Sequence, residues 1–259
     1  MIAATGHPRA VSTGVWQVWA RSDLPRDAVS SYWAGPHARI VTRIAGVSDY
    51  RQHHLSASAH GFWPAQGPLL STEIPTDWVI SGVPEVEFDG PLGSMKGLVT
   101  KATRALYRDE ANIFDRVLAN LSIPQGSRVF GAHSDDEATT AVVFFRRRAD
   151  VIAGAFRCLV RDELSRSLIT QNGVQEVRAH VFLPQAKWMW ATPGVAHDNP
   201  PHRRYHAMLS IRADTREVLD AALRRASEAH AAQQRRLCLA AHAYLVDTTR
   251  HIVANGVAQ

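Results

Sequence analysis

One short stretch of this 259-residue chain gathers several side chains that are suited to proton transfer. Trp33 and His37 stand four residues apart, so they share one face of a predicted helix. Tyr50, Gln52 and His54 alternate along a predicted strand and therefore share one of its faces. If that face lines a cavity, a single strand supplies a phenol, an amide and an imidazole to one place.

These residue types predict acid–base chemistry on a carbonyl compound. Histidine has an ordinary pKa of about 6.5, so His37 or His54 would move a proton near neutral pH. Tyr50 or Gln52 would polarise a carbonyl oxygen that gains charge, and Trp33 would pack on a substrate ring. The alternative is that His37 and His54 are structural residues that only satisfy helix and sheet packing.

Other residues carry weaker signals. We add Trp19 and Trp78 as predicted aromatic contacts to a substrate. Asp109 and Glu110 are interpreted as acids at the start of a helix, where its dipole stabilises them. Trp188 and Trp190 lie in a loop that would close the cavity as a lid or seal one end of the fold.

A metal site is not expected. His197, Asp198, His202 and His206 contain the right atoms, but their spacing is loose and Pro200-Pro201 interrupts it. The two cysteines are far apart and indicate free thiols in a cytoplasmic protein. Glycine-rich nucleotide loops and a serine-hydrolase elbow are absent from the sequence, so no cofactor is predicted.

The composition excludes several other classes. The chain is 46% hydrophobic and carries a formal charge of +5, with arginines scattered rather than arranged in an aromatic-interleaved stripe. We therefore expect no nucleic-acid partner. No apolar run approaches the roughly 18 residues that a membrane span requires, and the N-terminus lacks the apolar core of a signal peptide.

The hydrophobic periodicity predicts alternating strands and helices in the order β-α-β-β-α-β, followed by the same order again. We expect a kink at Gly35-Pro36 in the first helix and an extra helix between the second helix and the fourth strand. The predicted strands are residues 15–21, 47–55, 83–89, 127–133, 141–147, 174–183, 205–211 and 237–246, and the predicted helices are residues 23–44, 92–106, 109–121, 149–169 and 215–234.

An internal repeat supports this duplication. The segment G-V-S-D-Y-R-Q-H at residues 46–53 matches G-V-Q-E-V-R-A-H at residues 173–180, an offset of 127. The pairing of F-G-A-H at residues 130–133 with L-A-A-H at residues 239–242 has an offset of 109, as though the second copy lacked the extra helix. His53 and His180 are equivalent, and they would hold each sheet to its helices or meet inside the molecule.

Two such units have a direct physical consequence. Each four-stranded sheet carries helices on one face and needs a partner for the other. We therefore predict an α+β fold in which two ferredoxin-like repeats, residues 14–137 and 138–250, close into one barrel with a cavity between the sheets. Because the barrel closes within one chain, both a monomer and a homodimer are allowed.

The first repeat resembles the EthD family of the dimeric α+β barrel superfamily. The resemblance covers residues 14–134 and rests on Tyr32-Trp33, on His37-Ala38 and on the family's Y-x-x-H strand motif, which stands here in Y-R-Q-H-H at residues 50–54. The family's acidic and aromatic run is represented by Asp109-Glu110, Phe114 and Asp115. In the second repeat the positions of Trp33 and His37 hold Val160 and Leu164, so the helix motif is lost there.

The resemblance implies a cavity with histidine-centred chemistry on small hydrophobic or aromatic molecules. Our first hypothesis is a cofactor-independent lyase, dehydratase, isomerase or cyclase. The second is an oxygenase of the same fold, either cofactor-free or assisted by haem. The third is a non-catalytic binding protein for hydrophobic metabolites.

Overall fold

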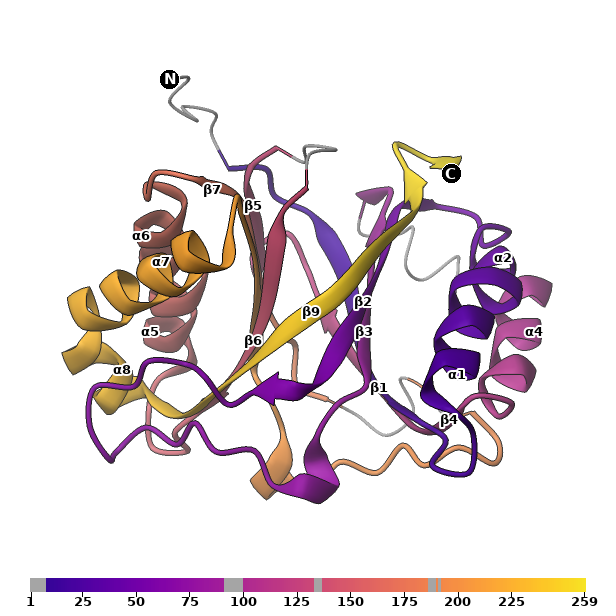
Figure 1. Cartoon of the computed structure of the whole chain (residues 1–259), viewed down its shortest axis with the longest axis horizontal. Helices are drawn as coiled ribbons and strands as arrows, with labels where there is room; N and C mark the ends of the chain where they lie inside the picture. Colours follow the sequence, from indigo (N-terminus) through magenta and orange to yellow (C-terminus); the bar gives the residue numbers. More distant parts are fainter. Residues whose placement is uncertain (1–7, 91–99, 133–136, 186–189, 191) are drawn as a thin grey trace.

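The structure is a computed structural model of the whole chain. It describes residues 8–90, 100–132, 137–185, 190 and 192–259. Two antiparallel sheets face each other across the centre, and each carries a layer of helices on its outer face (Figure 1).

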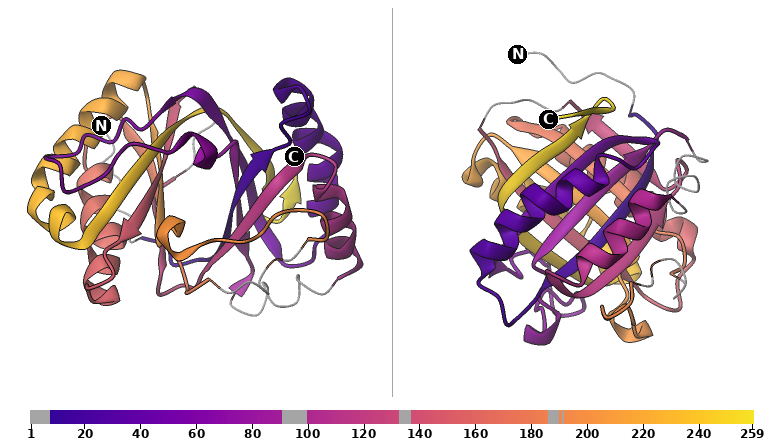
Figure 2. Two further views of the ribbon diagram at one scale, coloured as in Figure 1. Left: turned by 90° about the horizontal axis from the view of Figure 1, so that it is seen from below. Right: turned by 90° about the vertical axis from the view of Figure 1, so that its right-hand side faces the viewer.

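The first half contains the predicted β-α-β-β-α-β order. Its strands follow the sheet order β4-β1-β3-β2, and its helices cover one face of that sheet (Figure 2, right). The elements are β1 (Ser12–Ala20), α1 (Arg26–Tyr32), α2 (Ala38–Val41), β2 (Val47–His60), β3 (Gly82–Phe88), α4 (Lys101–Glu110) and β4 (Phe114–Ser122).

The second half repeats this arrangement in the sheet order β9-β6-β8-β7. The fold prediction of two ferredoxin-like repeats in a single-chain barrel is confirmed. The elements are β6 (Thr139–Arg147), α5 (Ala153–Arg157), α6 (Ser165–Ile169), β7 (Val174–Val181), β8 (Ala207–Ala213), α7 (Arg216–Ala229), α8 (Ala231–Leu237) and β9 (Cys238–Ala254).

Two long strands join the halves into one ten-stranded sheet. The end of β9 leaves its own sheet and pairs with β2, with Tyr50 opposite Val253. In the same way, β5 (Ser127–Gly131) follows β4 but pairs with β7 of the other half. A short β10 (Val257–Ala258) extends the edge of β9.

The predicted extra helix at residues 109–121 is wrong, because α4 ends at Glu110 and β4 begins at Phe114. Residues of this segment favour helices individually, but tertiary pairing with β1 overrides that preference. Val117 then faces the helices, and Leu118 faces the opposite sheet. The 109-residue offset was therefore a false match: β9 corresponds to β4 with β5, and His133 lies outside the described residues.

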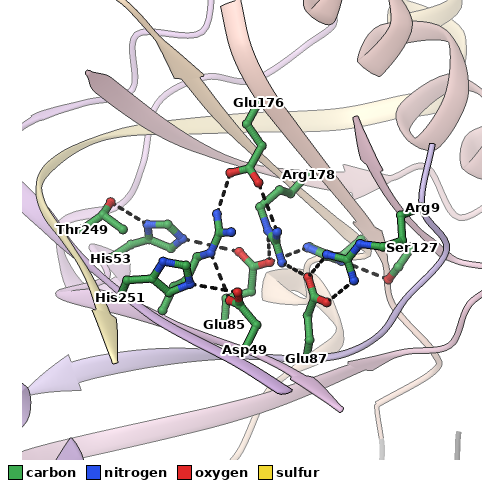
Figure 3. A network of polar contacts seen from close by, with 12 residues as sticks. Arg9, Asp49, His53, Glu85, Glu87, Ser127, Glu176, Arg178, Thr249 and His251 are labelled. Carbon is green, nitrogen blue, oxygen red and sulfur yellow. Dashed lines mark hydrogen bonds and ion pairs between the residues drawn. The ribbon is translucent and has the colours of Figure 1, made fainter. Parts of the chain in front are cut away.

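Side chains from both sheets pack into the space between them. One end holds an apolar cluster that includes Leu55, Phe144 and Tyr244. The other end holds a buried ionic network in which Arg178 contacts Glu85 and Glu87 of the first half and Glu176 of its own strand (Figure 3).

The repeat-related histidines belong to this network. His53 Nε2 lies 3.4 Å and His180 Nε2 lies 3.0 Å from the carboxylate of Glu85. The two imidazoles therefore meet between the sheets, which was the second of the two expectations for this pair. Burial would raise the pKa of Glu85, but Arg178 and the histidines hold it well below its usual value.

The two halves also exchange their long loops. The loop after β2 runs over the second half, where Ser71 bridges Ala240 of β9. The loop after β7 runs over the first half, where Ala196 bridges Arg116 of β4 (Figure 2, left). Each half therefore contributes side chains to the helix layer of the other.

Among the described residues, no helix combines the length and apolar character that crossing a membrane requires. The two cysteines, Cys158 and Cys238, are unpaired, the first exposed and the second buried.

Candidate active site

The candidate site lies between the sheet and the helices of the first half, not between the two sheets. Strand β2 alternates as predicted, but Tyr50, Gln52 and His54 face α1, whereas Arg51 and His53 face the other sheet. Alternation sorts residues into two faces without saying which face adjoins a ligand space.

A deep apolar pocket occupies this layer. It holds roughly 550 Å³ of space when its open mouth is included. Its polar groups are few, and they come from two helices and one strand. The wall includes Trp16, Val41, Val86, Leu106, Phe114 and Trp190, and the polar lining includes His37, Tyr50 and Glu110.

His37 enters the pocket from a π-helical turn, residues Trp33–His37. Pro36 lacks an amide donor, and at the end of this turn the Ala38 N–H reaches Trp33 O, five residues back. The predicted kink at Gly35-Pro36 thus takes the form of a π-turn, a feature that is frequent at functional sites.

A carboxylate orients the His37 ring. His37 Nδ1 lies 2.8 Å from Asp109 Oδ2, and the Tyr32 hydroxyl donates to Asp109 Oδ1 at 2.7 Å. Burial would raise the pKa of Asp109, but the hydrogen bonds from His37 and Tyr32 lower it, so the group is ionised. With a proton held on Nδ1, the Nε2 atom of His37 is left as the basic nitrogen of the ring.

Tyr50 is held as a neutral hydrogen-bond donor. Burial raises the pKa of its phenol, and its hydroxyl oxygen accepts a hydrogen bond from Gln52 Nε2 at 2.7 Å. The phenolic proton therefore remains available to a ligand in the pocket. Gln52 also donates to Trp33 O at 3.0 Å, which ties the strand to the π-turn.

Glu110 is a functional candidate that the sequence reasoning missed. Its side chain lines the pocket at the end of α4, not at the start of a helix. Trp190 Nε1 donates to both carboxyl oxygens at 3.0 Å, and the Thr192 hydroxyl also donates. Burial raises its pKa to about 7 despite these donors.

Trp190 belongs to the loop that the second half sends across the first. It packs edge-on against Trp16, with ring centroids 5.0 Å apart, and so forms part of the pocket wall. Trp188, the other tryptophan expected in a lid, lies outside the described residues. Of the two tryptophans behind the lid and seal interpretations of this loop, only Trp190 can therefore be placed.

His54 and Trp33 lie beside this pocket and line a second one. Their rings are 4.3 Å apart at the centroids. The indole of Trp33 also lies against Gly82, where an added Cβ would come within 2.4 Å of the ring. Glycine at this position allows the indole to approach the backbone of β3.

The structure places Trp19 and Trp78 elsewhere. They pack on each other with ring centroids 5.0 Å apart, in the cluster between the two sheets. The Arg116 guanidinium lies over both rings. Neither residue lines the pocket with His37.

The loop histidines do not gather as metal ligands. His206 Nδ1 accepts from the Arg147 amide at 3.1 Å, and the described residues contain no group of three or more candidate ligand residues. Haem also does not fit the described lining. His37 would be the iron ligand, but the lining has no lysine or arginine to pair with the two propionates, and it places the buried Glu110 beside them.

The equivalent layer of the second half is filled. At an offset of 127, His37 corresponds to Leu164 and Tyr50 to Val177, and both belong to the apolar core. Trp63 corresponds to Trp190, and its Nε1 donates to Gln234 at 3.0 Å as Trp190 donates to Glu110. Glu110 and Gln234 are 124 residues apart, so the offset of 127 does not align them, and their correspondence emerges only from these contacts.

Comparisons with known proteins define the fold. No family model matches the chain, and no curated protein matches it, so the EthD family is not confirmed and remains a resemblance. Solved structures do match over nearly the whole chain, and they share the dimeric α+β barrel architecture.

Three of these structures have TM-scores above 0.55. An anthrone oxidase-like protein has a TM-score of 0.57 at 10% identity, covering 96% of this chain and 95% of its own. A candidate monooxygenase from Lactobacillus acidophilus has 0.56 at 11% identity, covering 97% and 99%. One from Fusobacterium nucleatum has 0.57 at 10% identity, covering 95% and 96%. At such identities the likeness defines the architecture only.

Proposed function

We propose that this protein is a cofactor-independent enzyme that removes a proton from a small hydrophobic ketone or hydroxy-aromatic compound. The observation that carries the proposal is the His37–Asp109 pair at the wall of an apolar pocket that also holds Tyr50 and Glu110. An oriented imidazole, a neutral phenol and a carboxyl of raised pKa are the parts of an acid–base site.

Each group has a role that follows from its surroundings. His37 Nε2 takes the proton, because Asp109 holds the opposite ring nitrogen protonated and stabilises the imidazolium that forms. Tyr50 donates a hydrogen bond to the substrate oxygen, which gains negative charge as an enolate. Trp16, Phe114 and Trp190 contact the ring and exclude water.

Glu110 completes the cycle as an acid. With a pKa of about 7 it is half protonated at neutral pH. Delivery of its proton to a second carbon of the enolate gives an isomerisation, and delivery to a departing hydroxyl gives a dehydration with loss of water. In both cases His37 then returns its proton to Glu110 through solvent.

Proton–deuteron exchange tests the first step directly. We would incubate anthrone and a naphthol ketone with the protein in anaerobic D2O and follow the acidic C–H by NMR. We expect exchange that falls about 100-fold or more in His37→Gln and clearly in Asp109→Asn.

His206→Gln is the control, because His206 is a half-buried histidine that lies in the other half. It should keep the wild-type exchange rate. Exchange that is absent from the wild type for both compounds, or unchanged in His37→Gln, would refute the proposal and favour a binding protein without turnover.

An oxygenase is the second candidate, and the names of the similar solved structures favour it. The same enolate would react with O2, which would convert an activated CH2 into a carbonyl and release water. Oxygen uptake that depends on anthrone and on His37 supports this outcome. Exchange without oxygen uptake supports the lyase or isomerase instead.

A further inference from the structure

A second pocket adjoins the apolar one and has a different character. The two share Val18 and Phe114 in their linings. The second holds roughly 500 Å³ of space including its mouth. Its polar lining consists of Arg26, Ser30, His54, Ser81, Asp247 and Thr248.

His54 forms the buried end of this pocket. Its side chain is only 8% exposed. Its Nδ1 lies 2.8 Å from the Ser30 hydroxyl, whereas Nε2 has no hydrogen-bond partner among the described residues. A buried imidazole nitrogen without a partner is costly unless a ligand or water satisfies it.

The surroundings of His54 select the charge of that ligand. Burial is the main cause that lowers the pKa of His54 to about 4, and charge repulsion from Arg250 and Arg26 contributes. These two arginines place positive charge near the ring, although Asp247 stands at the exposed side of the pocket. A positive field around an unpaired nitrogen favours an anionic oxygen.

Hydroxyl donors stand in the same lining. Ser81 Oγ accepts the Ala20 amide at 3.0 Å, which leaves its own proton to donate. Thr248 adds a second hydroxyl. Together with Arg26 and the imidazole, these groups form a set of donors suited to both oxygens of a carboxylate.

We propose that this second pocket binds the carboxylate of a small organic acid, with His54 Nε2 as the buried contact and Arg26 at the entrance. The acid is either part of the substrate whose ring occupies the adjoining pocket or a separate molecule. The proposal does not depend on proton transfer by His37, since the two pockets use different polar residues.

Imidazole NMR on the full-length protein tests the proposal with acetate, benzoate and benzamide as probes. The His54 signal is assigned from its loss in His54→Gln. We expect saturable shifts with acetate and benzoate, and a raised pKa of His54 when either is bound. Benzamide, which is neutral but similar in shape to benzoate, should bind at least tenfold more weakly.

Two variants separate this site from the catalytic one. Arg26→Met removes an exposed cation, together with the hydrogen bond that its guanidinium donates to Leu55 O, and it should weaken both acids about tenfold. His37→Gln should leave acetate binding unchanged even if it abolishes turnover. Benzoate that binds about tenfold more tightly than acetate indicates a substrate carboxylate, and equal affinities indicate a separate acid.

Clear outcomes would overturn the proposal. They are the lack of a saturable His54 shift up to about 50 mM acetate and benzoate, or an equal response to benzamide. Unchanged affinity for both acids in Arg26→Met would also refute it.

Discussion

At one equivalent position the first half carries a carboxylic acid and the second half a carboxamide. Glu110 and Gln234 both accept a hydrogen bond from the indole of a tryptophan, Trp190 or Trp63, on the loop of the other half. The second half shows that glutamine satisfies this geometry in a filled core. We therefore interpret Glu110, whose pKa is raised at a pocket wall, as a residue with a proposed chemical role rather than one that packing alone requires.

The first prediction concerns Glu110→Gln. The variant should stay folded, as Gln234 does, but lose about 100-fold in turnover because an amide cannot supply a proton. The wild-type rate should fall as the pH rises through about 7, since the protonated acid is the active form. The variant should lack this limb of the pH–rate profile.

The same residue predicts a change in stability with pH. The folded pKa of Glu110 is above its unfolded value, so its contribution is fully present below about pH 4 and is lost as the pH rises through about 7. Urea unfolding at pH 5 and pH 8 should show a smaller loss in Glu110→Gln than in the wild type. An equal loss in both proteins would contradict the assigned pKa.

At the scale of elements, the π-turn and β3 together position the indole of Trp33. The indole of Trp33 extends from the π-turn and lies so close to Gly82 that a Cβ at this position would clash with the ring. We predict that Gly82→Ala displaces the indole and perturbs both pockets, with weaker substrate binding and an altered His54 NMR signal. Gly35→Ala, where an added Cβ meets nothing within 4 Å, is the matched control and should show neither effect.

Most elements could be predicted because their periodicity matched their burial. The strand at residues 47–55 and the helix at residues 149–169 are examples, although the helix includes a π-turn at Cys158–Leu164. Strand β4 could not be predicted, because only its pairing with β1 distinguishes D-R-V-L-A-N-L from a helix. Part of the predicted helix at residues 92–106 lies outside the described residues.

The candidate site was predictable in its residue types but not in its location. His37 and Tyr50 line one pocket, and Trp33 and His54 line the next. Asp109 and Glu110 were assigned to the start of a helix because the sequence reasoning ended α4 too early and began a new helix at Asp109. Trp190 comes from the other half through a long loop, a contact that local pattern does not encode.

At the scale of the whole molecule, the ionic network determines how the sheets are joined. Arg178 is fully buried and contacts three carboxylates on two strands. We predict that Arg178→Met destabilises the protein by about 3–5 kcal/mol at neutral pH, because buried charges lose their partner. The half-exposed pair of Arg216 and Asp220 is the control, and Arg216→Met should cost far less stability.

The network also predicts acid sensitivity. Burial would raise the pKa values of Glu85 and Glu176, but the charge of Arg178 outweighs this effect. Both pKa values therefore lie below those of the unfolded chain. Their stabilisation is therefore present above about pH 4.5 and is lost as the pH falls through the folded pKa. Thermal unfolding between pH 7 and pH 3 should show a steep fall for the wild type and a shallower one for Arg178→Met.

The filled helix layer of the second half has a consequence for how variation is tolerated. This layer holds Leu164 and Val177 in place of His37 and Tyr50. Substitutions in it should lower the amount of folded protein that a cell accumulates, but they should not change the specific activity of the folded molecules. In the first half, lining substitutions should do the reverse. A saturation library scored separately for abundance and for specific activity would then divide between the two helix layers, with Trp190 grouped with the first and Trp63 with the second.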